Sequence, residues 1–150
     1  PITQTEMREN LITQFSLGDT VFGLDAMRIQ EIVGVGEITK AYHAPEYIVG
    51  LMNLRGKIVT VMDLSRRLGL SEQKICTESR VLIMEWMNEY VGLLVENIID
   101  VIPIDPDAMD RIPENIPENQ SHFIERIYKE TRGLITILNV DTVLNENERA

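Results

Sequence analysis

Short runs of alternating apolar and polar residues, separated by turn residues, occupy most of this chain. The runs are rich in Val, Ile, Leu and Phe, and Gly, Asn or Asp stands between many of them. This alternation is typical of strands that bury one face, and it favours an all-β arrangement of barrels over a helix bundle. The predicted strands cover residues 11–17, 21–25, 51–54, 57–64, 81–87, 90–95 and 134–140.

Turn residues join three pairs of these strands into predicted hairpins. The first turn lies at residues 18–20 and has the sequence Gly-Asp-Thr, and another lies at Asn88 and Glu89. The third, at residues 53–56, has the sequence Asn-Leu-Arg-Gly, and its glycine, Gly56, can adopt the left-handed backbone that other residues resist.

Three short helices are predicted beside the strands. Residues 27–33 carry apolar side chains at helical spacing, and Asp25 could accept hydrogen bonds from the free amides at their start. Residues 64–70 would end at Gly69, a usual helix stop. A polar helix is predicted to begin near Asp141 and to finish the chain.

The two halves of the chain repeat each other's pattern. Val21-Phe-Gly-Leu-Asp25 corresponds to Tyr90-Val-Gly-Leu-Leu-Val-Glu96. A chain of 150 residues is long enough to bury roughly two-thirds of its unfolded surface. We therefore expect one domain, residues 1–150, made of two small barrels side by side, at approximately 15–75 and 80–140.

Charge and composition narrow the classes of partner. The chain has 24 acidic and 14 basic residues, and its net charge is -10. Nucleic-acid binding depends on clustered Lys and Arg, so no nucleic-acid partner is expected, and the same charge disfavours anionic lipid. Cys76 is the single cysteine and excludes an internal disulfide, and no apolar run reaches the ~18 residues of a membrane span. These features predict a cytoplasmic protein without direct membrane insertion.

The sequence contains no recognisable catalytic, metal or nucleotide motif. It lacks G-x-x-x-x-G-K-[ST], G-x-S-x-G and H-E-x-x-H. His43 and His122 have no further ligands at the spacing that a metal site requires. Asp105, Asp107 and Asp110 do not fit a calcium loop, because the required glycine is absent. We expect no catalytic residues, no metal, no cofactor and no enzymatic activity.

One block resembles the core of the CheW family, the coupling proteins of bacterial chemotaxis: Gly50-Leu-Met-Asn-Leu-Arg-Gly-Lys-Ile-Val-Thr-Val-Met-Asp-Leu64. The family commonly has Gly-Val-x-Asn-Leu-Arg-Gly-x-Ile-x-Pro-Val-x-Asp-Leu there, and Thr60 takes the place of its proline. Residues 15–34 and, more weakly, 90–101 and 134–144 are similar to other parts of the family. The resemblance implies a mainly β fold: two SH3-like five-stranded barrels packed about a shared apolar seam, with a few short helices, one of them C-terminal.

The resemblance also implies two protein partners, the cytoplasmic tip of chemoreceptors and the regulatory domain of a histidine kinase. In the family, a groove between the barrels holds the helical hairpin of the receptor tip. The matching positions here are Ile29, Glu31, Ile32 and Val101. Aliphatic side chains with one carboxylate at the rim suit a helix in a groove, although the apolar residues of a short helix are also commonly core.

The turn block supplies the remaining candidate residues. The strand after the turn carries the candidate kinase contacts, which are Lys57, Val59 and Val61. The turn residues assigned to structure or to partner contact are Asn53, Arg55 and Gly56. The forked guanidinium of Arg55 could tie the corner to a carboxylate or could meet a partner, and the sequence leaves both readings open. Residues 107–128 match the family least, so no site residue is assigned there.

The function implied by the resemblance is that of a non-catalytic adaptor that couples chemoreceptors to a chemotaxis histidine kinase in signal transduction. Two alternatives stay open. One is a CheW-like module of another kinase pathway, such as twitching motility. The other is a small-ligand-binding or metal-dependent β-barrel enzyme, which a stoichiometric metal or cofactor in the purified protein would favour.

Overall fold

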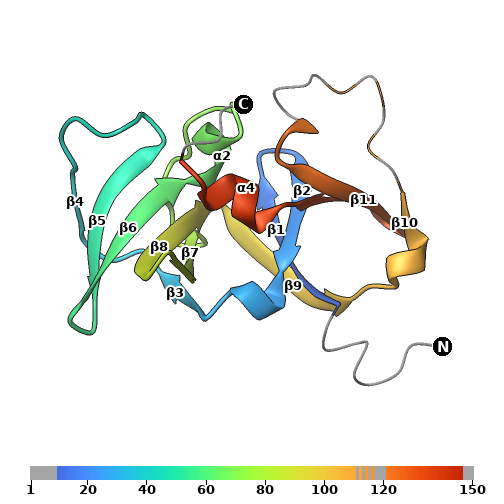
Figure 1. The fold of residues 1–150 in the computed structure, drawn as a ribbon, viewed down its shortest axis with the longest axis horizontal. Coiled ribbons are helices and arrows are strands. Elements are labelled where there is room, and N and C mark those ends of the chain that lie inside the picture. Colours follow the sequence, from blue (N-terminus) through green and yellow to red (C-terminus); the bar gives the residue numbers. More distant parts are fainter. Residues whose placement is uncertain (1–9, 111, 113, 115, 117–120, 147–150) are drawn as a thin grey trace. The chain divides into compact units, whose positions relative to one another are not determined.

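The computed structural model describes residues 10–110, 112, 114, 116 and 121–146, and it is mainly β (Figure 1). One sheet contains β1 (Leu11–Leu17), β2 (Thr20–Asp25), β9 (Asn97–Pro103), β10 (Met109–Asp110), β11 (Ile124–Glu130) and β12 (Gly133–Leu138). The other contains β3 (Glu31–Gly34), β4 (Ile38–Thr39), β5 (Ile48–Leu54), β6 (Lys57–Asp63), β7 (Arg80–Trp86) and β8 (Glu89–Val95). The α-helices are α2 (Leu64–Arg67) and α4 (Val140–Leu144), and 3-10 helices lie at Ala26–Arg28 and Pro106–Ala108.

The chain divides into two compact units. Unit 1 contains the described residues up to Arg28 together with those from Ile99 onward, and unit 2 is Ile29–Ile98. The predicted division into residues 15–75 and 80–140 is therefore wrong. The observed division follows from the parallel pairing of β2 with β12, which brings strands from the two ends of the sequence into one sheet. Local patterns cannot reveal a pairing between strands so distant in sequence.

Unit 1 is built on the sheet with strand order β10-β11-β12-β2-β1-β9. Its apolar cluster consists of Ile12, Ile104, Ile135 and Ile137. The helix α4 follows β12, and Asn139 caps it by accepting a hydrogen bond from the amide of Thr142 at 3.1 Å. This helix begins at Val140 and buries three aliphatic side chains, so it is less polar than predicted.

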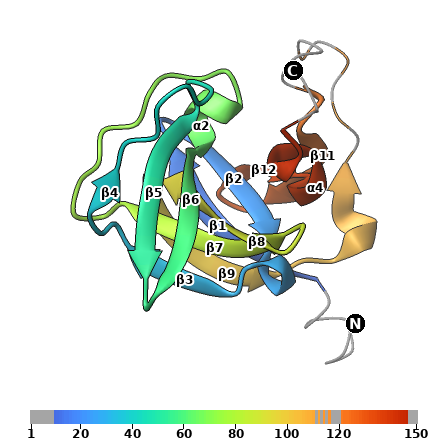
Figure 2. The ribbon, with the colours of Figure 1, turned by 60° about the vertical axis from the view of Figure 1, so that its left-hand side comes forward.

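Unit 2 is built on the sheet with strand order β3-β7-β8-β6-β5-β4. Figure 2 shows β4 beside β5 and the long β5–β6 hairpin. The pairing of β6 with β8 is parallel, and β7 and β8 form an antiparallel hairpin. The buried apolar cluster of this unit consists of Met52, Val59, Val61, Val81, Ile83 and Leu94.

The structure confirms the predicted hairpins, with one shift. Arg55 and Gly56 both have positive φ, at 52° and 83°, as a two-residue turn between twisted strands requires. Between β7 and β8 the turn residues are Met87 and Asn88, because Glu89 already pairs with Trp86. The predicted turn at Asn88 and Glu89 is one residue too late.

The helix predicted at residues 27–33 is wrong. A 3-10 helix occupies Ala26–Arg28, where Asp25 accepts the amide of Met27 at 2.9 Å, and the chain then extends into β3. The amide of Gln30 donates to the carbonyl of Ile83 on β7 at 2.8 Å. Residues with branched β-carbons favour such pairing, and a neighbouring strand therefore overrides the helical spacing.

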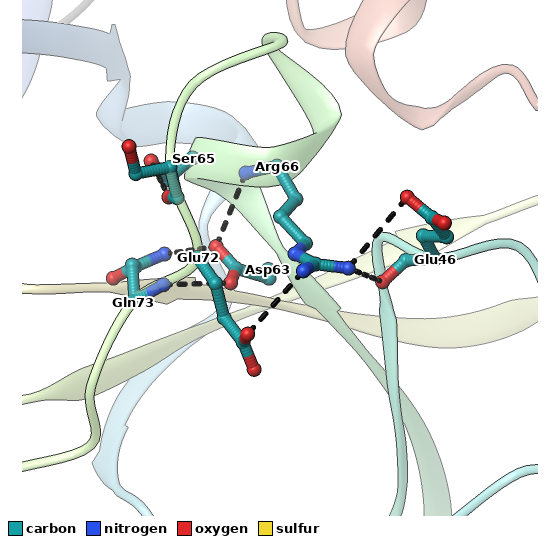
Figure 3. A network of polar contacts seen from close by, with 7 residues as sticks. Glu46, Asp63, Ser65, Arg66, Glu72 and Gln73 are labelled. Carbon is teal, nitrogen blue, oxygen red and sulfur yellow. Dashed lines mark hydrogen bonds and ion pairs between the residues drawn. The ribbon is translucent and has the colours of Figure 1, made fainter.

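A buried carboxylate fastens α2 to the loop that follows it, as Figure 3 shows. Asp63 is 3% exposed and caps α2 by accepting the amide of Arg66 at 3.3 Å. It also accepts the backbone amide of Gln73 at 3.0 Å and the side-chain amide of Gln73 at 2.6 Å. The same side-chain nitrogen donates to the carbonyl of Leu94 on β8 at 2.6 Å. Asp63, Arg66 and Gln73 are called the Asp63 cluster below.

Candidate partner-binding site

Four polar side chains gather at one end of the unit 2 sheet: Glu31, Arg55, Lys57 and Tyr90. The guanidinium of Arg55 donates a hydrogen bond to the carboxylate of Glu31 and forms an ion pair with it. The ammonium of Lys57 lies 3.1 Å from the hydroxyl of Tyr90 and 4.8 Å from the centre of its ring. We call these four residues the charged corner.

Strand alternation explains why the charged corner forms. Glu31 shares a face of β3 with Val33, which packs against the apolar cluster of unit 2. Lys57 shares a face of β6 with Val59, and Tyr90 packs partly against the same cluster. The charged corner therefore continues the inner face of the sheet at the end where the β5–β6 turn lies.

Both members of the Glu31 and Arg55 pair are ionised at neutral pH. The hydrogen bond from Arg55 lowers the pKa of Glu31, partial burial opposes that shift, and the charges of Arg55 and Lys57 lower it further. Reciprocally, the hydrogen bond and charge of Glu31 raise the pKa of Arg55. The structure thus shows an intramolecular partner for Arg55, while its side chain stays largely exposed.

The Arg55→Ala variant is expected to melt at a slightly lower temperature than the parent protein, and only while Glu31 is ionised. Folding lowers the pKa of Glu31, so this carboxylate stabilises the protein at every pH above the ordinary pKa of Glu, 4.5. The stabilisation is lost as the pH falls through the lower pKa of the folded state. The difference in Tm should therefore be present at pH 7 and vanish in acid. Lys40→Ala, which also removes an exposed cation, is the control, and a difference that is independent of pH would contradict the assignment.

The predicted receptor-binding residues lie in both units. Glu31 and Ile32 occupy β3 of unit 2, Ile29 is half-buried just before that strand, and Val101 is exposed on β9 of unit 1. Because β3 alternates, Ile32 is exposed on the face opposite to Glu31. The predicted helical stripe through Ile29, Ile32 and Val33 does not exist.

The structure contradicts two of the predicted kinase contacts. Val59 and Val61 are fully buried in the apolar cluster of unit 2 and cannot touch a partner, whereas Lys57 is exposed. Moreover, β6 lies between β5 and β8, so it is not an edge strand. Residues 57–62 are almost all apolar or β-branched, so the sequence could not indicate which face of β6 points inward.

The β5–β6 hairpin exposes to solvent the face opposite to Val59 and Val61. Ile58 is 58% exposed, and Leu51 on β5 is also exposed. Leu51 pairs with Thr60, and Asn53 pairs with Ile58, so the two aliphatic residues are diagonal neighbours across the strands. We call Leu51, Asn53, Ile58 and Thr60 the outer hairpin face. Asn53 also accepts the amide of Gly56 at 2.9 Å, which assigns it a structural role in the turn.

The acidic residues of the 105–110 segment have local partners. Asp105 accepts the amide of Asp107 at 3.0 Å, and Asp110 lies 3.4 Å from the ammonium of Lys129. Within the described residues, no three His, Cys, Asp or Glu side chains converge in a way that could hold a metal ion. In the same part of the chain, no helix is long and apolar enough to cross a membrane.

These features define a class of protein first: a mainly β molecule of two SH3-like subdomains, each with a six-stranded sheet in which one strand has only two residues. The crystal structure of the scaffolding protein TtCheW from Thermoanaerobacter tengcongensis matches it with a TM-score of 0.83 and 33% identity, covering 94% of this chain and 91% of that one. The fold class predicted from the sequence is confirmed.

Sequence comparisons agree with the structural match. A chemotaxis protein CheW from Bacillus subtilis is 28% identical and covers 88% of this chain and 85% of its own. A probable chemotaxis protein CheW from Rhizobium etli is 26% identical, covering 89% and 86%. The profile of the CheW-like domain matches residues 12–148. The chain belongs to the CheW-like domain family, and its role is that of a chemotaxis coupling adaptor.

Proposed function

We propose that this adaptor acts without catalysis in the cytoplasm, where it binds the regulatory domain of a chemotaxis histidine kinase and the cytoplasmic tip of chemoreceptors. The proposal that the protein binds the kinase rests on the outer hairpin face. Exposed aliphatic side chains that adjoin one another commonly mark a protein interface. The outer hairpin face replaces the buried Val59 and Val61 as the proposed kinase contact, and Lys57 at the end of the same strand is retained.

The receptor half of the proposal keeps Ile29, Glu31, Ile32 and Val101. Ile32 and Val101 are exposed aliphatic residues, and Glu31 offers a carboxylate beside Arg55. Such residues suit an amphipathic helix, whose apolar side chains recur at helical spacing. Arg55 orients Glu31 in this proposal, so that the carboxylate is held in place before the helix arrives.

The Ile58→Asp variant should bind the kinase regulatory domain at least about tenfold more weakly than the parent, because it places a charge at the centre of the outer hairpin face. Its Tm should remain close to that of the parent, since Ile58 is largely exposed in the free protein. Calorimetric titration with the regulatory domain of the same organism's kinase, at moderate salt, measures the change. Binding of a receptor-tip fragment should be unaffected.

Two further variants control this experiment. Met87→Asp changes an 80% exposed residue in the β7–β8 turn of the same unit and should leave kinase binding unchanged. Val59→Asp buries a charge in the apolar cluster and should unfold unit 2. Equal kinase affinities for Ile58→Asp and the parent would remove the outer hairpin face from the proposal. Failure of the parent protein to bind the kinase domain would overturn the kinase half altogether.

A further inference from the structure

The strand β9 presents a long free edge. In the described residues it is an end strand of its sheet, and its seven residues make it longer than the other end strands β3, β4 and β10. Two of its aliphatic side chains, Ile99 and Val101, are each 44% exposed. A long edge with exposed aliphatic side chains invites pairing with another chain, and natural sheets protect such edges.

Alternation along β9 determines which of its backbone amides face outward. The amide of Ile104, directly after β9, donates to the carbonyl of Asn10, directly before β1, at 2.9 Å. Successive amides of an extended strand point in opposite directions, so the odd-numbered residues of β9 direct their amides away from β1. Pro103 is one of these residues and has no amide hydrogen. The outward donors in the middle of the strand are therefore the amides of Ile99 and Val101.

Asp100 occupies one of these two outward donors. Its carboxylate accepts the amide of Val101 at 2.8 Å, and both residues are exposed. A local hydrogen bond between a side chain and the backbone competes with strand pairing for the same donor. Asp100 also shares a face of β9 with Ile102, which packs against the apolar cluster of unit 1. A charged residue on the inward face of an end strand is a known protection against edge pairing.

An antiparallel pairing of two β9 strands shows what this hydrogen bond opposes. In such a pair, the residues whose amides face the partner exchange hydrogen bonds. Two-fold pairings centred on Ile99, Asp100 or Val101 all use the amide of Val101. The pairing centred on Asp100 sets Ile99 of each copy opposite Val101 of the other, which would cover both aliphatic side chains. It also places the two Asp100 carboxylates directly opposite each other, and like charges in this position are destabilising.

We propose that Asp100 keeps the β9 edge closed to a second copy of this chain by holding the amide of Val101 and by placing a charge on the edge. A second copy is the partner that this edge fits, because Ile99 and Val101 match each other across an antiparallel pair. The contact acts in the free protein, so it does not depend on the proposed binding of kinase or receptor.

The first test is self-association. Asp100→Ala should associate at least about tenfold more tightly than the parent, because it frees the amide of Val101 in both copies and removes two facing charges. Sedimentation equilibrium of the full chain, at concentrations up to about 1 mM, measures the dissociation constants. Asp100→Asn keeps an oxygen that can accept the amide of Val101, so it should associate less than Asp100→Ala.

Asp19→Ala is the matched control, because it removes the same charge from an exposed turn of unit 1. It should behave as the parent protein does. Equal dissociation constants for Asp100→Ala and the parent would overturn the proposal. Equal association of Asp100→Asn and Asp100→Ala would overturn the role of the hydrogen bond, and association of Asp19→Ala would show that net charge alone keeps the copies apart.

The second test is hydrogen exchange, which examines the hydrogen bond itself and locates the contact. In dilute protein, the amide of Val101 should exchange roughly three- to tenfold faster in Asp100→Ala than in the parent, after correction for intrinsic rates. In concentrated Asp100→Ala, the amides of Ile99 and Val101 should become protected, because they enter the ladder between the two copies. An unchanged rate for Val101 in the dilute variant, or association without protection of β9, would contradict the proposal.

Discussion

Asp63→Ala is expected to reduce the free energy of unfolding by roughly 3 kcal/mol or more, in a protein whose total stability is about 5–15 kcal/mol. One carboxylate serves the helix cap of α2 and both amides of Gln73. Loss of a cap costs about 1 kcal/mol, and each buried donor left without a partner costs about 1–3 kcal/mol. Denaturant unfolding followed by circular dichroism measures the difference.

Glu72→Ala provides the comparison for the Asp63 cluster. The carboxylates of Glu72 and Glu46 flank the guanidinium of Arg66 (Figure 3). Their oxygens lie 3.3 and 3.7 Å from its nitrogens, and both carboxylates are exposed. Exposed ion pairs contribute about 0–1 kcal/mol, so this variant should remain close to the parent protein. Similar losses in Asp63→Ala and Glu72→Ala would show that the buried carboxylate does not fasten the loop.

Gly50→Ala is the second substitution from which we expect a large effect. The residue lies in β5 with φ at +155°, a backbone region that other residues rarely adopt. A methyl group there would overlap the carbonyl oxygen of Thr39 on β4, and backbone cannot move aside as a flexible side chain can. Backbone strain and overpacking cost about 1–3 kcal/mol each, so we expect a loss of roughly 2–6 kcal/mol.

Gly34→Ala is the matched control, because a methyl group at this exposed position of β3 meets no atom within 4 Å. Its effect on the free energy of unfolding should stay within about 0.5 kcal/mol. Hydrogen exchange adds a local measure: in Gly50→Ala, amides of β4 and β5 should exchange faster, since the overlap forces these two strands apart. Equal stability of the two alanine variants would refute the close approach of β4 to Gly50.

The sequence predicts those parts of the fold that depend on local chemistry. The β1–β2 and β5–β6 hairpins follow from alternation and from turn residues such as Gly18 and Gly56, which need no distant partner. The helix predicted at residues 27–33 is wrong because β7, far along the chain, supplies the hydrogen bonds that make residues 31–34 a strand. Predicting β3 would have required knowledge of that neighbour.

The candidate site also depends on contacts between segments that are distant in the sequence. Glu31 and Arg55 are each recognisable from the sequence, but their pairing depends on the curvature of a sheet that local patterns do not describe. The inward face of β6 is ambiguous in the sequence because both of its faces carry apolar side chains, so the predicted kinase contact at Val59 lies in the core.

The parallel pairing of β2 with β12 has a consequence for synthesis on the ribosome. All strands of unit 2 lie between Ile29 and Ile98, so this unit can fold as soon as that continuous segment has emerged. The β1–β2 hairpin is made earlier, but the edge of β2 has no partner until residues 133–138 arrive. Unit 1 is therefore begun first and finished last, and a chain that stops before β12 keeps an open strand edge that invites aggregation.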